Sequence, residues 1–388
     1  MHDGEPVPAR SGAGLARRLT TNIVKATSAY EAWLEAQAPP IPADLERKHR
    51  AMASDPFVFL RGTAYRWAER WPVVCADVAD APALRTVADL HIENFGTWRD
   101  AEGRLVWGVN DLDEAITLPY TNDLVRLVTS TAVAGLALGP KEAASAVIEG
   151  YRSALASGGR AFVLAEDQLF LRDLALRSLK DPDRFWGKLR SRAAGDMDGL
   201  STEAIAAAEG LLPEGAIEVT TFHRVAGVGS LGRQRVVAVG RLAGAFVARE
   251  AKAVVPSAWT FAGREGASDG LGQCGVMTAL GRDAVRSIDP WWRASSGWVV
   301  RRLAPDCSRI ELGDLPKQRD EHTLLHAMGS ETANLHLATP TAAPAILADL
   351  DRRDPRWLTA AAEAMAADIV ADHQAWVRHM KNAAPVPH

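Results

Sequence analysis

The 388-residue chain is poor in cysteine, with only Cys75, Cys274 and Cys307, and it has four tyrosines and no long apolar run. Three cysteines that lie far apart, without Cys-x-x-Cys spacing, exclude both a disulfide framework and a cysteine-rich zinc site. The longest apolar-leaning run, 127–138, contains Thr and Ser and is too short to span a bilayer. The first 18 residues lack the apolar core of a signal peptide. We therefore expect a cytoplasmic protein with no membrane partner.

The chain also lacks an excess of positive charge, because 48 acidic residues outnumber 44 Lys and Arg and the formal net charge is −4. Proteins that bind nucleic acid as their main partner present basic faces to the phosphate backbone. We therefore expect no nucleic-acid partner. The length predicts two or three domains or lobes, since a domain commonly has about 150 residues. The composition leaves the oligomeric state open.

The hydrophobic pattern predicts an α+β protein in which helices outnumber strands. Helical spacing covers 20–35, 44–53, 56–69, 122–138, 140–157, much of 160–215, 320–337 and 354–380, and 264–281 is only weakly helical. Residues 216–225, 234–239 and 245–255 are β-branched or alternating, which predicts a small antiparallel sheet near 216–258, and 297–303 is predicted as a further strand. We expect four parts: a mobile tail (1–20), a helical lobe (21–215), a β lobe (216–305) and C-terminal helices (306–388).

Residues 86–115 contain two clusters of acidic and amide side chains. Asp89 and Asn94 lie in the first cluster, and Asp111 and Asp113 lie in the second. The β-leaning runs 83–88 and 105–109, with turn residues 100–103 between the clusters, predict a strand pair that brings Asp89, Asn94 and Asp111 to one edge. Carboxylates held close together need a cation or a shared proton. Oxygen ligands of this kind suit Mg²⁺, which takes one or two carboxylates plus substrate phosphates. A capped turn explains one cluster equally well.

A glycine-rich segment, Gly227-x-Gly229-Ser230-x-Gly232, lies between two of the expected strands. A dinucleotide-binding fingerprint requires a helix directly after the glycines, and here a β-branched run follows. A glycine loop between two strands, bent over phosphates, is the protein-kinase arrangement. A plain glycine hairpin is the alternative interpretation.

Lys252 lies on the next expected strand, where alternation places it on the same face as Phe246 and Glu250. A lysine one hairpin after the glycine loop is where a kinase holds the α- and β-phosphates of ATP. A solvated strand lysine is the alternative. The combination with the glycine loop favours the phosphate-binding interpretation.

Asp89-Leu-His-x-x-Asn94, followed by Asp111-Leu-Asp-Glu-Ala115, resembles the catalytic and metal-binding motifs of aminoglycoside-phosphotransferase-like kinases. Asp123 resembles the aspartate at a helix start that steadies their catalytic loop. From about residue 45 to 380 the chain resembles the uncharacterised bacterial family called domain of unknown function 2252. The other stretches that carry this resemblance are 55–62, 225–232, Lys252, 299–303 and 333–336.

The resemblance implies a protein-kinase-like two-lobe fold in circularly permuted order, because the catalytic segment precedes the glycine loop by about a hundred residues. The helix 320–337 would then be the one that conventionally precedes the catalytic loop. Asp89 would orient or deprotonate an acceptor hydroxyl. Asn94, Asp111 and Asp113 would form the Mg²⁺ site, while Lys252 and the backbone N–H groups of 227–232 would hold ATP.

Three further residues are candidates with a structural alternative. His91 is a metal or substrate ligand, or a structural loop histidine. Arg61 meets a phosphate or a carboxylate of the catalytic segment, or forms a structural salt bridge. Arg301 is a nucleotide- or substrate-site candidate. The chain departs from the kinase pattern at Ala88, where glycine is usual, and only Glu265 is a candidate partner for the phosphate-binding lysine.

These patterns predict an ATP- and Mg²⁺-dependent phosphotransferase that acts on a hydroxyl of an unidentified small-molecule acceptor. A nucleotide-binding, pseudokinase-like regulator without transfer activity is the first alternative. Transfer of a nucleotidyl group on the same fold stays open. A metallo-phosphoesterase is a weaker alternative, because Asp89-Leu-His91 matches only the opening ligand pair of that class and its later histidine motifs are missing.

Overall fold

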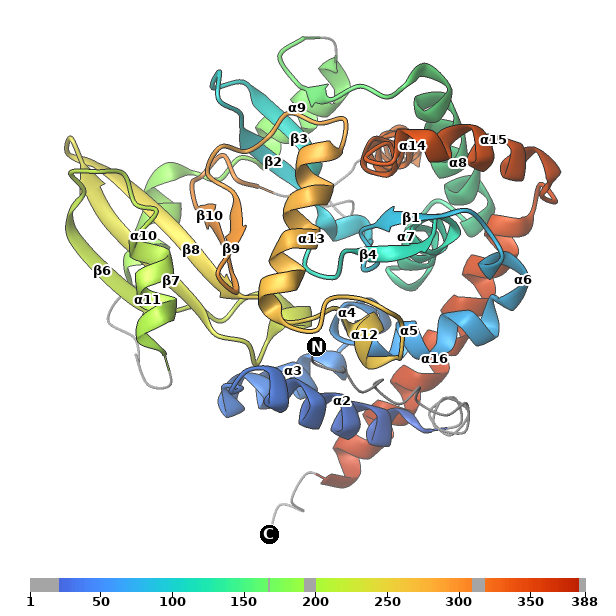
Figure 1. Cartoon of the computed structure of the whole chain (residues 1–388), viewed down its shortest axis with the longest axis horizontal. Helices are drawn as coiled ribbons and strands as arrows, with labels where there is room; N and C mark the ends of the chain where they lie inside the picture. Colours follow the sequence, from blue (N-terminus) through green and yellow to red (C-terminus); the bar gives the residue numbers. More distant parts are fainter. Residues whose placement is uncertain (1–20, 167, 192–199, 309–317, 384–388) are drawn as a thin grey trace, which may run out of the picture.

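The computed structural model describes residues 21–166, 168–191, 200–308 and 318–383, so the expected N-terminal tail lies outside the described residues. Helices and antiparallel sheets form one mixed α+β body, with the largest sheet on one side and most helices on the other (Figure 1). The helices are α2 (Ile23–Gln37), α3 (Pro42–Met52), α4 (Pro56–Gly62), α5 (Ala64–Val74), α6 (Ala76–Ala79), α7 (Thr121–Val133), α8 (Pro140–Ser157), α9 (Leu169–Ser178), α10 (Pro182–Ser191), α11 (Thr202–Glu209), α12 (Ala258–Phe261), α13 (Gly270–Asp283), α14 (Gln318–His336), α15 (Ala343–Arg352) and α16 (Trp357–Ala383).

The strands form three antiparallel sheets. They are β1 (Ala83–Thr86), β2 (Phe95–Arg99), β3 (Leu105–Val109), β4 (Ile116–Pro119), β5 (Phe162–Val163), β6 (Ile217–His223), β7 (Arg235–Leu242), β8 (Ala245–Ala253), β9 (Arg293–Ser295) and β10 (Trp298–Arg302). The sheet orders are β1-β4, β2-β3-β5 and β6-β7-β8-β10-β9. Short 3₁₀ turns, η1 (Ile92–Asn94), η2 (Val228–Ser230) and η4 (Pro340–Ala342), complete the described elements.

The five-stranded sheet is covered on both faces by helices that precede it in the chain. Leu189 of α10 packs with Phe222 and Val237 on one face. Ala204 of α11 packs with Val236 on the other face, as strand alternation requires. The helices α10 and α11 therefore pack against the sheet, although the expected lobe boundary at residue 215 groups them with the helical lobe.

The prediction that residues 83–88 pair with residues 105–109 is wrong. β3 pairs with β2, in the register Phe95 to Val109 and Arg99 to Leu105, while β1 pairs with β4. The turn at Asp100 joins only the strands directly beside it, and the carboxylate of Asp100 accepts backbone N–H bonds from Glu102 and Arg104. The weakly helical 264–281 contains the regular helix α13, whose N-cap is Asp269.

Helices α8 and α14 cross at a contact where each backbone touches the other. A β-carbon added at Gly150 would overlap with the carbonyl oxygen of His326, and one added at Gly329 would overlap with the carbonyl oxygen of Val147. Glycine is needed at both positions because no side chain fits between the two backbones. Through this contact α14 packs on α8, and it also contacts β1 and β3, the strands that precede the two acidic clusters. Within the described ranges, no helix combines the length and apolar content needed to cross a membrane.

We predict that Gly329→Ala lowers the free energy of unfolding by about 1–3 kcal/mol, because the added methyl group forces the two helix backbones apart. Gly275→Ala is the matched control in α13, where a β-carbon meets nothing within 4 Å. It should raise stability by about 0.5–1 kcal/mol, the usual gain for alanine over glycine in a helix. Urea denaturation of both variants measures the difference, and equal effects would contradict the close approach.

Candidate functional site

A cavity of about 60 Å³ lies where the acidic clusters meet the glycine-rich segment. The candidate residues that line it are Arg61, Asp89, His91, Asn94, Asp111, Asp113, Gly227, Gly229 and Ser230. The structure thus brings together two segments that lie more than a hundred residues apart in the chain. Gly232 does not line this cavity, because its backbone packs against the side chain of Leu45 on α3.

Lys252 joins the five-stranded sheet to the second acidic cluster. It lies in the middle of the sheet, opposite Arg235 on one side and Val299 on the other. Its ammonium group forms ion pairs with Asp113 and, at 3.3 Å, with Asp111. Burial and the neighbouring charge of Asp111 raise the pKa of Asp113. The two carboxylates and the lysine therefore form one electrostatically coupled group.

Glu265, the candidate partner of the lysine, is exposed in the segment after α12. The carboxylates that pair with Lys252 come instead from the segment between β3 and β4. The prediction that Glu265 pairs with Lys252 is therefore wrong, because the negative charge beside Lys252 comes from the acidic cluster rather than from the segment that follows the lysine strand.

Asp89 forms an ion pair with Arg126 of α7, whose side chain is completely buried. The guanidinium of Arg126 lies 4.8 Å from the ring centre of Trp67 and donates to the carbonyl of Leu60. Burial raises the pKa of Asp89 to about 7; the positive charge of Arg126 opposes this shift, and Glu114 and Asp111 add to it. A carboxylate with a pKa near neutrality is suited to accept a proton from a substrate.

The backbone just before Asp89 is held by Asp123 at the start of α7. Its carboxylate accepts N–H bonds from Val87 at 2.8 Å and Ala88 at 2.9 Å, and His336 of α14 lies 3.2 Å from the same group. Ala88 has φ +65°, in the left-handed region that favours glycine. Asp123 therefore holds a strained turn that sets the direction of Asp89.

We predict that Ala88→Gly raises the free energy of unfolding by about 1 kcal/mol, because glycine removes the left-handed strain of alanine. Ala115→Gly is the matched control, a buried alanine of the same region whose φ is not positive. The control should lose about 0.4–1 kcal/mol through the greater freedom of the unfolded chain. Thermal and urea unfolding of the pair decide between strain relief and a general effect of glycine.

His91, Asn94 and Arg61 all take part in local structure at the cavity wall. The Oδ1 atom of Asn94 accepts from the backbone N–H of His91 at 2.6 Å, and Nδ1 of His91 accepts from the N–H of Glu93 at 3.2 Å. The ring of His91 packs edge-on against Phe57. Arg61 forms a 2.6 Å ion pair with Glu93. The carboxylate alternative for Arg61 is therefore the one that the geometry supports.

The glycine-rich segment is packed down onto the N-terminal helices. Lys48 of α3 donates to the carbonyl of Gly229 at 3.4 Å, and a β-carbon at Gly229 would lie 2.8 Å from the carbonyl oxygen of Arg61. Arg235 donates to the hydroxyl of Ser230 at 2.6 Å. These contacts keep η2 close to Asp89, which explains why the cavity measures only about 60 Å³.

The donor atoms around the cavity fit Mg²⁺ better than a metal held by protein groups alone. Asp111 and Asp113 supply carboxylates, and the side-chain oxygen of Asn94 keeps a second lone pair beside its hydrogen bond to the backbone. Within the described part of the chain there is no cluster of three or more His, Cys, Asp or Glu arranged to hold a metal ion. Magnesium commonly completes its coordination with water and substrate phosphates.

Several charged residues of the site escaped the sequence analysis. Arg126 interrupts an apolar helix face, and this pattern is a signal for a buried ion pair. Glu250 has the same strand parity as Lys252 and is buried among Arg224, Arg235 and Arg301. Burial acts to raise the pKa of Glu250, but the charges of these arginines outweigh it and hold that pKa well below its ordinary value. Their convergence comes from strand register, which no single segment reveals.

Comparison with known proteins gives one family match for this chain. Residues 40–177 match the family model described as "Uncharacterized protein conserved in bacteria (DUF2252)". The matched part contains Asp89, Asn94, Asp111 and Asp113, whereas Lys252 and the five-stranded sheet lie outside it. No curated protein and no solved structure matches the chain. The matched family is the uncharacterised family that the sequence motifs resemble, and the match indicates no activity.

Proposed function

We propose that the protein is an ATP- and Mg²⁺-dependent phosphotransferase with a kinase-like arrangement in permuted order, acting on a hydroxyl of a small molecule. The observation that carries the proposal is the convergence of Lys252 with Asp111 and Asp113 beside Asp89 and the glycine-rich segment. A lysine on a strand, two metal-binding carboxylates and a candidate base are the parts that phosphoryl transfer needs.

In the proposed reaction, the acceptor oxygen forms a bond to the γ-phosphorus while the bond from that phosphorus to the β,γ-bridging oxygen breaks. The acceptor proton passes to Asp89, whose pKa near 7 matches this role. Arg126 fixes the direction of that carboxylate. Magnesium held by Asp111, Asp113 and Asn94 would supply charge neutralisation, and Lys252 would bind the phosphates once its carboxylate partners face the metal.

Loading of a triphosphate requires the glycine-rich segment to rise from the carboxylates, since about 60 Å³ is too little for three phosphate groups. The contact between Lys48 and Gly229 and the packing of η2 on α4 are the interactions that must be released. The N–H group of Ile41 also donates to the carbonyl of Gly232 at 2.8 Å. The opening therefore breaks hydrogen bonds and van der Waals contacts that the binding of Mg-ATP has to offset.

We predict that Asp111→Asn lowers ATP turnover at least about 100-fold, since it removes a charge that acts on the transferring group, while the protein stays folded. The same loss is expected for Asp89→Asn. Asp173→Asn, an exposed aspartate of α9, is the control and should keep full turnover. The assay measures ADP release from labelled ATP in the presence of pooled metabolites. Full turnover by Asp111→Asn would end the assignment.

A second candidate function is a nucleotide-binding regulator without transfer activity. The observation that favours it is that the ammonium group of Lys252 pairs with the candidate metal ligands themselves rather than with a separate glutamate. Thermal shift with Mg-ATP separates the two functions. A raised melting temperature that Lys252→Met abolishes, together with no ADP release from any metabolite pool, would favour the regulator.

A further inference from the structure

A second, larger pocket of about 480 Å³ adjoins the carboxylate cavity and shares Asn110 and Gly227 with it. Its walls come from β2, β10, the end of β6, and the segment between α13 and β9. A third cavity of about 10 Å³, lined by Lys252 and Arg301 among others, shares Asn110 with both. The volume of the larger pocket falls within the ordinary range for small-molecule sites, about 300–1,000 Å³.

The pocket is strongly cationic among its described residues. The charged side chains on its wall are Lys180, Arg224, Arg282, Arg286, Arg301 and Arg302, against one carboxylate, that of Asp289. Glu250 lies behind the wall and pairs with Arg224, Arg235 and Arg301, so a single negative charge faces three positive ones. An excess of guanidinium groups at a concave surface attracts anions and presents paired donors that match phosphate or carboxylate oxygens.

Two buried donors of this cluster have no hydrogen-bond partner within the described ranges. They are the Nε atoms of Arg224 and Arg302, both residues of the pocket wall. Arg302 makes only long ion pairs, 3.3 Å to each oxygen of Asp306. A buried donor without an acceptor is costly in a folded protein. Both Nε atoms are enclosed by protein atoms, but the two arginine side chains are 21% exposed, so an anion in the pocket would meet their outer guanidinium nitrogens.

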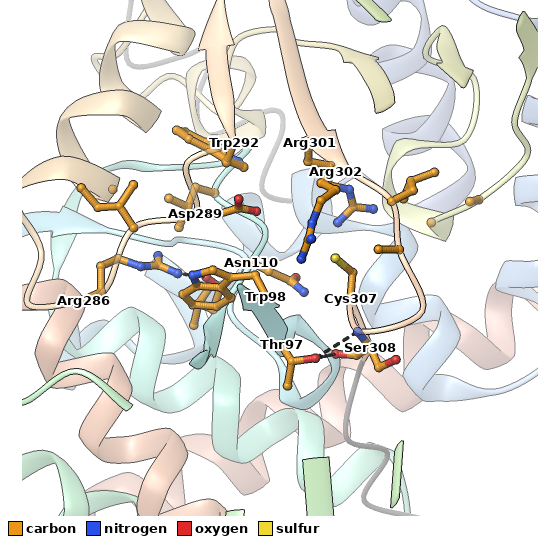
Figure 2. Close-up of a pocket in the computed structure, with 18 of the residues that line it drawn as sticks. Thr97, Trp98, Asn110, Arg286, Asp289, Trp292, Arg301, Arg302, Cys307 and Ser308 are labelled. Carbon is orange, nitrogen blue, oxygen red and sulfur yellow. Dashed lines mark hydrogen bonds between the residues drawn. The ribbon is translucent and has the colours of Figure 1, made fainter. Parts of the chain in front are cut away.

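The opposite side of the pocket carries two indole rings, and the guanidinium of Arg286 lies 4.8 Å from the ring centre of Trp98. Figure 2 shows the indole rings of Trp98 and Trp292 on one side and Arg301, Arg302 and Cys307 on the other. Aromatic walls bind planar rings, and a guanidinium cluster across the cavity binds an oxyanion. Glu250 lies two residues before Lys252 on β8. Its carboxylate and the arginines that pair with it occupy this part of the sheet surface, so an apolar ring does not pack there.

We propose that this pocket binds a ring-bearing small molecule through its phosphate groups, with Arg224, Arg301 and Arg302 as the anion-binding residues and the indoles of Trp98 and Trp292 as the ring-binding side. Anion binding here needs no metal and no transfer step, so it stands apart from the phosphotransferase proposal. The ligand is a phosphorylated aromatic compound, which is either the nucleotide itself or the acceptor.

Isothermal titration calorimetry of the full chain in EDTA tests the proposal with ADP, adenosine and phenyl phosphate as probes. We expect ADP to bind at least about tenfold more tightly than adenosine, and this preference to shrink as salt is raised, because ion pairs are screened. Tight binding of phenyl phosphate would identify an acceptor-type ligand, and binding of ADP alone would identify the nucleotide. Equal affinity for ADP and adenosine would overturn the anion site.

Arg301→Gln is expected to weaken ADP binding at least about tenfold, the loss that follows when a charge-assisted contact to phosphate is removed. The variant should fold, since Arg224 and Arg235 still compensate Glu250, and circular dichroism verifies this. Arg302→Gln leaves Glu250 untouched and should also weaken binding. Arg241→Gln, at the far end of β7 and paired with Glu218, is the control and should bind as the native protein does.

The variant Asp111→Asn separates this proposal from the transfer reaction. In EDTA it should bind ADP at least as well as the native chain, because it removes a negative charge that acts on Arg301. If the native chain binds ADP in this way but releases no ADP from ATP with any metabolite pool, the phosphotransferase proposal fails and the anion site stands. Unchanged ADP affinity in both Arg301→Gln and Arg302→Gln would overturn the anion site and leave the phosphotransferase proposal standing.

Discussion

The ion pairs of Lys252 with Asp111 and Asp113 are the interactions on which the site depends, because they join the sheet to the acidic segment. The three groups lie together, and the charges of Asp111 and Lys252 act in opposite directions on the pKa of Asp113. Replacing Lys252 alone would leave the two carboxylates side by side without their counter-charge, which is costly in a folded protein. If the proposed magnesium site forms, its cation would compete with the ammonium group of Lys252 for the two carboxylates.

Acidic and basic side chains lie on different sides of the site. Acidic groups gather where the β2-β3 hairpin ends, while basic groups gather along β8 and β10, and the two populations meet at Lys252. A ligand with both a metal-binding and an anionic part would match this division. The buried Arg126 and Asp123 hold the acidic side in place from α7, so one helix positions both the candidate base and the turn before it.

Much of the architecture follows from local pattern. Helical spacing located α7, α14 and α16, and alternation located β6, β7, β8 and β10 of the five-stranded sheet, because each of these elements buries one continuous face. The three-residue β9 was missed. The pairing of β1 was not deducible, since a short apolar run fits either neighbour and the choice depends on the turn at Asp100. The motifs identified Asp89, Asn94, Asp111 and Lys252 as candidates, and the structure brings them together. The ion pairs that surround them, such as that of Glu250 with Arg301, join residues about 50 positions apart and depend on strand register.

The crossing of α8 and α14 at Gly150 and Gly329 limits which parts of this chain can fold alone. The stretch that matches the known family, 40–177, contains α8 but ends long before α14, which supplies the backbone against which Gly150 packs. Expressed alone, that stretch would leave the crossing face of α8 uncovered and Asp123 without its neighbour His336. The sequence limits of the family match are therefore not the limits of a folding unit, and experiments on the acidic segment require the chain at least through α14.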